Sequence, residues 1–240
     1  MQLSVIGPVY NEEENLEKNI KEFDAYLNKQ NFDFEIIIVN DGSTDKTKEI
    51  AKKLTELLPE VKLLSKEINQ GKGAAVRDGL LAGTGNFLLF LDADNATPID
   101  TLEKTWPLLK TNDLVIGSRN YHDTIQAKEI KKQILIKRIL GVSGNKLIRL
   151  FTGLKINDTQ CGFKIFHKAS VSSIIPKTKI NRWAIDVEIL TIAKNKNLKV
   201  GIAPVTWTCG PTSRVGFKGY LIALKELFII KLNDLRGKYN

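Results

Sequence analysis

Two near-continuous apolar runs constrain this chain more than any other feature. Residues 34–39 read F-E-I-I-I-V, and residues 87–91 read F-L-L-F-L. Short runs rich in β-branched or aromatic residues, without regular polar alternation, predict strands that are buried on both faces of a sheet. Sheets with both faces buried are mostly parallel, and helices connect their strands. We therefore expect an α/β fold.

The segments around these runs alternate as such a fold requires. We expect further strands at residues 3–6, 61–64 and 113–116, and helices at about 12–27, 46–58 and 73–82. Helices of 10–15 residues between strands indicate βαβ units with right-handed crossovers. The pattern predicts an open, mostly parallel, twisted and Rossmann-like sheet flanked by helices.

The second half of the chain is expected to contain basic amphipathic helices. We predict helices over residues 126–151, with a break at Gly141–Gly144, and over 218–235. Between them, strands are expected near 163–166 and 199–205, and a helix near 187–193. No linker or repeat separates the halves, so we expect a single domain over residues 1–240, with functionally different parts 1–120 and 121–240.

Charge is distributed unevenly between these two parts. Residues 1–120 contain 14 basic and 20 acidic residues, whereas residues 121–240 contain 22 basic and 7 acidic residues. The basic half predicts an anionic partner, which is a nucleic acid, a phosphorylated substrate or a membrane surface. A nucleic-acid-binding module is the non-enzymatic alternative. The chain has no RNA-recognition or helix-turn-helix pattern, so no nucleic-acid partner is expected.

Composition narrows the remaining classes of protein. No stretch reaches ~18 uncharged apolar residues, as a membrane-spanning helix needs. Residues 1–15 lack the basic start and apolar core of a signal peptide. We therefore expect a cytoplasmic protein, soluble or peripheral to a membrane, with Cys161 and Cys209 reduced. Two histidines are too few for the usual zinc clusters.

Acidic residues follow two of the predicted strands. Asp41 comes after the second strand, and Asp92 and Asp94 come directly after F-L-L-F-L. Ligands of open α/β sheets bind beyond the carboxyl ends of the strands. Two neighbouring carboxylates repel each other unless a cation lies between them, and Mg²⁺ or Mn²⁺ prefers oxygen ligands together with substrate phosphates. Asp41 could bind a base or ribose, or could simply form a turn.

The segment N-Q-G-K-G at residues 69–73 precedes a predicted helix. Its backbone N–H groups and Lys72 could face a phosphate, although a plain turn into the helix explains the sequence equally well. The chain has neither the P-loop pattern nor G-x-G-x-x-G.

Taken in order, these motifs resemble those of family 2 glycosyltransferases with the GT-A fold. The resemblance rests on Pro8-x-Tyr10-Asn11-Glu12, on the Asn40–Asp45 and Gly71–Gly73 segments and on Asp92-x-Asp94. It continues through G-S-R at 117–119, D-T-Q-C-G-F-K at 158–164 and W-A-I-D-V-E at 183–188. The later motifs are most similar to those of polyprenyl- or dolichyl-phosphate glucosyltransferases, and next to those of mannosyl-phosphate synthases.

The resemblance implies a role for each matching residue. The nucleotide sugar would contact Pro8, Tyr10, Glu12, Asp41, Lys72, Asp92, Ala93 and Arg214. Mg²⁺ or Mn²⁺ would bind Asp92 and Asp94; mannosyl relatives often have a glutamine where this chain has Ala96. The acceptor phosphate would contact Arg119, Lys137 and Arg138. The catalytic residues would be Asp94, Arg119 and Asp186.

The implied reaction is inverting transfer of a hexose, glucose from UDP-glucose, to a polyprenyl or dolichyl phosphate. The alternatives are mannose as the sugar, or a hydroxyl acceptor with Asp186 as the base. Asp186 and Glu188 could contact sugar hydroxyls or pair with Arg182, and Asp158 could order Arg119 or Lys164.

A lipid acceptor implies contact with the cytosolic face of an anionic membrane through residues 126–151 and 218–235. The rival interpretation is that these helices pack on the sheet.

Overall fold

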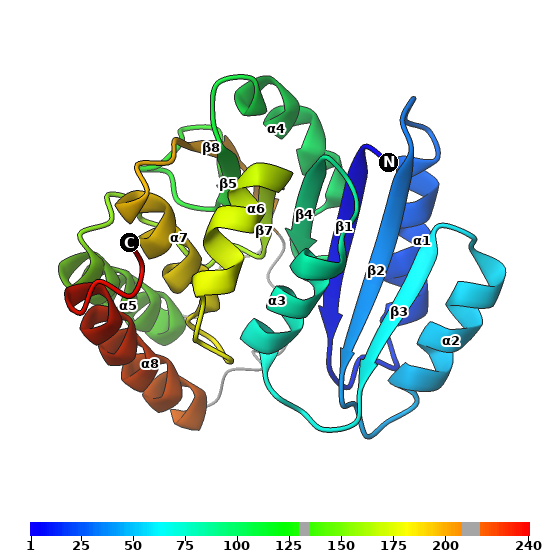
Figure 1. The fold of residues 1–240 in the computed structure, drawn as a ribbon, viewed down its shortest axis with the longest axis horizontal. Helices are drawn as coiled ribbons and strands as arrows, with labels where there is room; N and C mark the ends of the chain where they lie inside the picture. The colour runs from blue at the N-terminus through cyan, green and yellow to red at the C-terminus, as the bar shows by residue number, and fades with distance from the viewer. Residues whose placement is uncertain (130–134, 208–216) are drawn as a thin grey trace.

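The computed structural model describes residues 1–129, 135–207 and 217–240, and only the backbone of 128–129, 135–143 and 217–218. Its main feature is a seven-stranded sheet with strand order β3-β2-β1-β4-β7-β5-β8 (Figure 1). The strands are β1 (Leu3–Val9), β2 (Phe34–Asp41), β3 (Val61–Lys66), β4 (Phe87–Leu91), β5 (Leu114–Ser118), β7 (Phe163–His167) and β8 (Val200–Pro204). Only β7 is antiparallel to its neighbours in this sheet.

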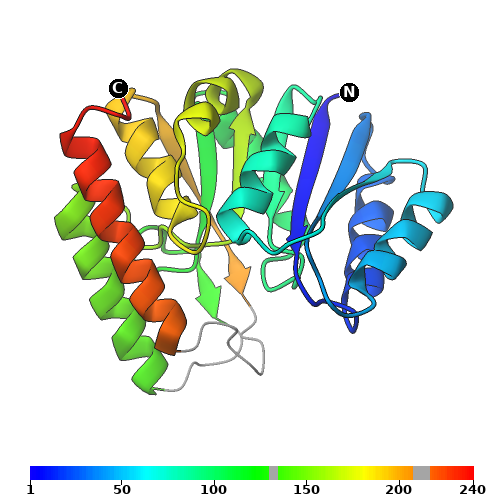
Figure 2. The same cartoon turned by 60° about the horizontal axis from the view of Figure 1, so that its bottom comes forward.

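Helices cover both faces of the sheet (Figure 2). One face packs against α1 (Leu16–Leu27), α2 (Thr47–Leu57) and α4 (Leu102–Leu109), which follows the short 3₁₀ turn η1 (Ile99–Thr101). The other face packs against α3 (Lys72–Ala82), α6 (Lys168–Ile174) and α7 (Ile185–Asn195), with η2 (Ile175–Lys177) between the last two. Beyond α7 lie α5 (Leu135–Thr152) and α8 (Phe217–Leu235), side by side in both views.

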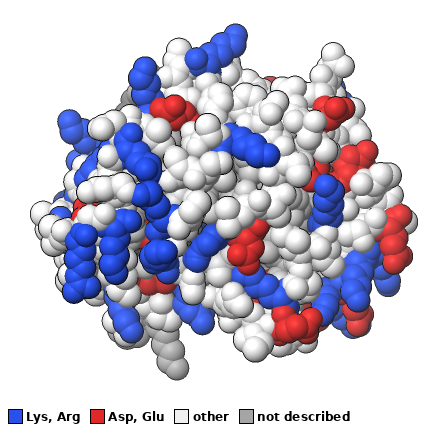
Figure 3. Space-filling model, in the orientation of Figure 1, with Lys and Arg blue, Asp and Glu red and all other residues white. Residues whose placement is uncertain are grey.

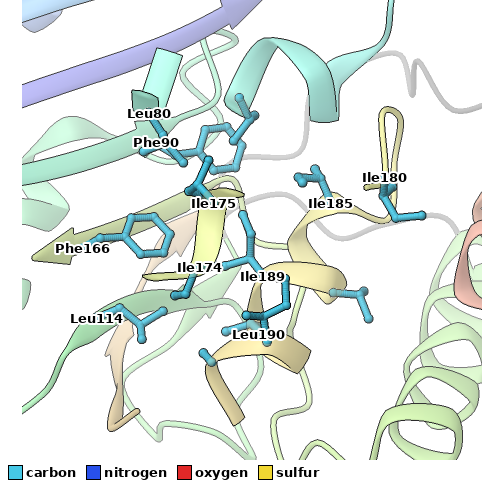
Figure 4. Close-up of a cluster of buried hydrophobic side chains, with 14 of the residues drawn as sticks. Leu80, Phe90, Leu114, Phe166, Ile174, Ile175, Ile180, Ile185, Ile189 and Leu190 are labelled. Carbon is cyan, nitrogen blue, oxygen red and sulfur yellow. The ribbon is translucent and has the colours of Figure 1, made fainter. Parts of the chain in front are cut away.

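The apolar runs are buried because each side of a strand meets a helix layer. In β2, Ile36 and Ile38 pack with the α1 side, whereas Ile37 and Val39 pack with the α3 side. The α3 side forms a continuous cluster in which Phe90 lies near residues from α7 (Figure 4). This two-sided burial explains why the sequence shows no alternation of apolar and polar residues.

Two helix predictions are wrong in part. The helix expected from residue 12 begins at Leu16, because residues 12–15 form a turn closed by bonds from Asn15 N and Leu16 N to Glu12 O. Over 126–151, Lys128–Glu129 form strand β6, which pairs with β9 (Thr206–Trp207), and residues 130–134 lie outside the described residues. The expected break is absent, because α5 continues through both glycines. A glycine inside a helix costs only about 1 kcal/mol relative to alanine.

Candidate active site

The predicted polar segments lie along one edge of the sheet. Strands β1, β2 and β4 are parallel, and β4 and β5 are both antiparallel to β7. The residues that follow Val9, Asp41, Leu91 and Ser118 therefore emerge at the same edge. Because β7 runs in the opposite direction, residues 158–162 lead into it from that edge too.

Asp41 holds the loop that precedes α3. Its side chain is buried, and its two carboxylate oxygens accept hydrogen bonds from Gln70 N (3.1 Å) and Gly71 N (2.7 Å). The loop is tight: Gly42 has φ +68°, and a Cβ there would lie 2.5 Å from Asn69 N. Asp41 thus fixes the backbone immediately before Lys72. A bond from Asp41 to a base or ribose stays a prediction.

The glycines around Lys72 are required by close packing. A Cβ on Gly71, which has φ +106°, would lie 2.4 Å from Asn181 O. A Cβ on Gly73 would lie 2.6 Å from Ile180 O, and Gly73 N donates to Arg182 O (3.1 Å). The G-K-G pattern is therefore satisfied by backbone contact with residues 180–182.

Lys72 lies between two carboxylates. Its Nζ is 2.9 Å from Asp92 Oδ1 and 3.1 Å from Asp92 Oδ2, and 3.9 Å from Asp186 Oδ2. The ammonium is also 5.1 Å from the centre of the Phe90 ring. Burial alone would lower the pKa of Lys72, but the charges of Asp92 and Asp186 outweigh it and raise that pKa. Lys72 is therefore a fixed cation at the end of β4.

Asp92 and Asp94 follow β4 at this edge, where Asp92 is partly exposed and Asp94 is exposed. Asp92 approaches Gly162 so closely that a Cβ at residue 162 would lie 2.0 Å from Asp92 Oδ2. Asp94 Oδ1 accepts a hydrogen bond from Ala96 N (3.0 Å). The pKa of Asp94 is raised, because surrounding protein removes part of the hydration of its carboxyl group and because Asp92 is negatively charged.

These two carboxylates fit a divalent cation that is shared with a ligand. A cation would relieve the repulsion that raises the pKa of Asp94. Within residues 1–129, 135–207 and 217–240, no group of three or more His, Cys, Asp or Glu side chains is arranged to hold a metal ion. Mg²⁺ or Mn²⁺ at Asp92 and Asp94 would therefore need further ligands from a diphosphate and water, as magnesium sites commonly do.

Arg119 is held rigidly at the end of β5. Asp158 accepts hydrogen bonds from Arg119 N, Nε and Nη2, each at 2.8 Å. This fork orients the guanidinium, which is 33% exposed and lies 5.3 Å from the centre of the Trp207 ring. Burial would lower the pKa of Arg119, but the Asp158 charge raises it. The sequence left Arg119 and Lys164 as alternative partners of Asp158, and the structure shows hydrogen bonds to Arg119.

Asp123 binds the residues next to both Arg119 and Asp158. Its carboxylate accepts hydrogen bonds from Ser118 Oγ (2.8 Å), Asn157 N (2.9 Å) and Asp158 N (2.9 Å). The loop before β7 is thereby tied to the end of β5. Asp123 has no motif around it in the sequence, and so it was missed.

Asp186 and Glu188 occupy different surroundings at the start of α7, and both are buried. Asp186 Oδ1 lies 2.5 Å from the Nζ of Lys164, a fully buried lysine of β7. Glu188 accepts hydrogen bonds from Lys179 N, Ile180 N and the Tyr239 hydroxyl. Its role in the described structure is to hold residues 179–180 and the end of the chain.

The other predicted residues are divided between this edge and the undescribed parts of the chain. Tyr10 is 43% exposed, Pro8 is partly exposed and Glu12 is buried, with Glu12 N donating to Thr47 Oγ1 (2.7 Å). Ala93 is buried, and its carbonyl accepts a hydrogen bond from Asn19 Nδ2 (2.6 Å). Arg214 and the side chains of Lys137 and Arg138 lie outside the described residues.

Comparison with known proteins identifies the family. Residues 4–175 match the model of glycosyl transferase family 2. A dolichyl-phosphate beta-glucosyltransferase of Trichomonas vaginalis is 37% identical over 96% of this chain and 73% of its own length. One of Drosophila melanogaster is 34% identical over 100% of this chain and 77% of its own length.

Solved structures support the fold. Glucosyl-3-phosphoglycerate synthase of Mycobacterium tuberculosis, in complex with Mn²⁺, UDP and phosphoglyceric acid, has a TM-score of 0.71. It is 17% identical, and the match covers 100% of this chain and 78% of that one. The expected GT-A fold, with its mostly parallel sheet between helices, is confirmed.

Proposed function

The chain belongs to glycosyl transferase family 2, and on this premise we propose that it transfers glucose from UDP-glucose to the phosphate of a dolichol or another polyprenol. The observation that carries the proposal is the identity of 32–37% to dolichyl-phosphate beta-glucosyltransferases across nearly the whole chain. The motifs at the sheet edge supply the chemistry that such a transfer needs.

A lipid phosphate is already an anionic nucleophile, so attack on the anomeric carbon needs no strong general base. It does need a fixed cation that orients the acceptor phosphate, and Arg119 is our candidate because Asp158 holds its guanidinium by a fork of hydrogen bonds. Asp92 and Asp94 would hold Mg²⁺ or Mn²⁺, which when bound stabilises negative charge on the departing diphosphate. Lys72 adds a second positive charge beside Asp92.

A hydroxyl acceptor is less compatible with this edge. That reaction needs a base, and the candidate from the sequence is Asp186. Its side chain is 2% exposed and both of its oxygens face lysines, Lys164 at 2.5 Å and Lys72 at 3.9 Å. With one oxygen bonded to Lys164 and the other facing Lys72, Asp186 has no oxygen left to approach a hydroxyl acceptor.

The lipid acceptor also implies contact with a membrane, at its cytosolic face. No helix in the described part of the chain is long and apolar enough to cross a membrane. Helix α8, however, exposes a stripe of apolar side chains at helical spacing: Leu221 (53% exposed), Leu224 (38%), Phe228 (55%), Leu232 (45%) and Leu235 (72%). This stripe is our candidate for the bilayer contact.

The charges around the apolar stripe of α8 favour an anionic leaflet over a second copy of the chain as its partner. Lys225 lies within the stripe and Arg236 follows it, both exposed, and basic residues gather around α5 and α8 (Figure 3). The acidic residues of α8 are occupied elsewhere: Glu226 accepts hydrogen bonds from Arg182 N and Ala184 N, and Asp234 from Asn195 Nδ2. Two such faces would repel each other, whereas an anionic surface would attract them.

The test of the reaction is product analysis. The purified chain is incubated with dolichyl phosphate, Mg²⁺ and either UDP-glucose or GDP-mannose, and the lipid products are identified by mass spectrometry. We expect a glucosyl-phospholipid that does not form in EDTA. Transfer only from GDP-mannose, or only to a hydroxyl acceptor, would contradict the proposal.

A further inference from the structure

A buried ion pair between Lys164 and Asp186 lies behind the site, and the proposed transfer to a phosphate acceptor does not use it as a base. Lys164 is 0% exposed, and its Nζ bonds to Asp186 Oδ1 (2.5 Å) and to the carbonyl of Cys161 (2.7 Å). Removing an ammonium and a carboxylate from water costs several kcal/mol per ion, and similar apolar residues often replace such pairs without loss of stability. The demands of folding alone therefore do not explain this pair.

The second oxygen of Asp186 faces the active site. It is 3.9 Å from Lys72 Nζ, and Lys72 in turn contacts both oxygens of Asp92. The four side chains form one row, Lys164–Asp186–Lys72–Asp92, which runs from the core to the sheet edge. Lys164 comes from β7, Asp186 from α7 and Lys72 from α3, so the row joins three separate elements.

We propose that Lys164 and Asp186 are positioning residues, which hold the Lys72 ammonium beside Asp92 where the diphosphate of a nucleotide sugar binds. This inference rests on the proposed function and deepens it. Asp186 alone would draw Lys72 inward. Lys164 supplies Asp186 with its own counter-charge and so leaves Lys72 available to Asp92 and to a phosphate.

The row also fixes the local charge. Asp92, Asp94 and Asp186 carry three negative charges, against two positive charges from Lys72 and Lys164. One divalent cation changes this balance from net negative to net positive, which suits an incoming diphosphate. Without Lys164 the same ion would leave the group neutral, so we expect diphosphate affinity to fall. In Asp186→Asn the group would instead be more positive, so weaker nucleotide binding by that variant would reflect the lost position of Lys72 and not the charge.

The first experiment is a double-mutant cycle between Asp186 and Lys72. UDP and GDP binding are measured by calorimetry with Mn²⁺ for the parent, Asp186→Asn, Lys72→Met and the double variant. If Asp186 acts through Lys72, each single change weakens binding about tenfold, and Asp186→Asn has no further effect in the Lys72→Met background. Additive effects would overturn the proposal.

The second experiment separates positioning from folding. Lys164→Met/Asp186→Leu replaces both charges by apolar side chains. We therefore expect its Tm to be near that of the parent, whereas its nucleotide binding should be about tenfold weaker. A variant with both Tm and nucleotide binding like the parent would show that the pair does not position Lys72 for nucleotide binding. Glu35→Gln is the matched control, because it removes a buried carboxylate paired with a lysine at the opposite edge of the sheet.

The acceptor provides a further check. We expect the KM for dolichyl phosphate to change less than about twofold in Asp186→Asn, whereas the KM for the nucleotide sugar rises about tenfold; equal changes in both would contradict the proposal. A parent protein that binds neither UDP nor GDP would refute the proposed function together with this inference. A parent that binds UDP while all variants bind equally well would refute the inference alone.

Discussion

Strand β2 buries a carboxylate at each end, and the two carboxylates bind different parts of the molecule. At the start, Glu35 accepts hydrogen bonds from Ser4 Oγ (2.6 Å), Thr84 Oγ1 (2.6 Å) and Lys62 Nζ (2.7 Å). At the other end, Asp41 accepts bonds from the backbone of the loop before Lys72. Glu35 links neighbouring strands, whereas Asp41 fixes the loop that precedes Lys72.

The comparison shows that burial of a charge does not identify a functional residue. Both ends of the sheet contain buried carboxylates with lysines beside them. They differ in their surroundings: the partners of Glu35 belong to the framework of the sheet, whereas Asp92 and Asp186 both face Lys72. Asp41 fixes the backbone just before that lysine. Changes at the two edges should therefore separate stability from activity.

The largest effect is expected for Asp94→Asn, which removes one of two carboxylates that a cation would bridge. We expect transfer to fall ~10³-fold or more with little change in Tm, because stabilisation of the leaving diphosphate is lost. Asp100→Asn, an exposed aspartate after the same strand, is the control. Activity of folded Asp94→Asn like that of the parent, or full parent activity in EDTA, would rule out this metal site.

The next effect is expected for Arg119→Ala. We expect the efficiency with dolichyl phosphate to fall ~10²-fold while UDP binding is unchanged, because a bidentate, fixed guanidinium is lost. Arg119→Lys keeps the charge without the fork and should recover only part of the activity. An unchanged acceptor KM and rate would exclude Arg119 from the acceptor site.

A smaller effect is expected at the apolar stripe of α8. Leu221→Ser/Leu232→Ser should weaken binding to anionic vesicles about thirtyfold, since each of the two leucines loses about 1 kcal/mol of burial. Turnover with a water-soluble acceptor should not change.

The control for that variant is Leu57→Ser/Leu81→Ser, which changes two leucines on α2 and α3 that are somewhat more exposed (64% and 56%) than Leu221 and Leu232. We expect vesicle cosedimentation of this control like that of the parent, weakening as salt rises. Equal binding by both double variants would place the membrane contact elsewhere.

The smallest effect on activity is expected at the opposite edge, for Glu35→Gln. Burial alone would raise the pKa of Glu35, but bonds from Lys62, Ser4 and Thr84 lower it to about 2 from 4.5. Its stabilising contribution, at most about 3 kcal/mol, is therefore complete above pH 4.5 and is lost as the pH falls toward 2.

Unfolding by denaturant between pH 7 and pH 2 measures this contribution. The stability difference between the parent and Glu35→Gln should narrow as the pH falls below 4.5, while kcat and both KM values at pH 7 stay within about twofold. A difference independent of pH would contradict the assignment, and a selective loss of nucleotide affinity would remove the contrast between the two edges.

Much of the site could be predicted because it follows from chain direction. Parallel strands end at one edge, so Asp41, Asp92 and Arg119 had to emerge at the same edge once their strands were recognised. The prediction of a helix over 126–151 is wrong at Lys128–Glu129, because strand pairing with Thr206–Trp207 outweighs the local helical preference there. Partners distant in sequence decide such segments.

The α/β class, the family and the types of residue at the strand ends follow from the sequence alone, because periodicity and motif order are local properties of the chain. The pairing of charges does not, because it depends on the tertiary structure. Asp158 engages Arg119 across 39 residues, and Lys72 reaches Asp186 from a different helix. These ion pairs depend on how strands and helices pack, because a charged side chain pairs with the opposite charge that packing brings within a few ångströms of it.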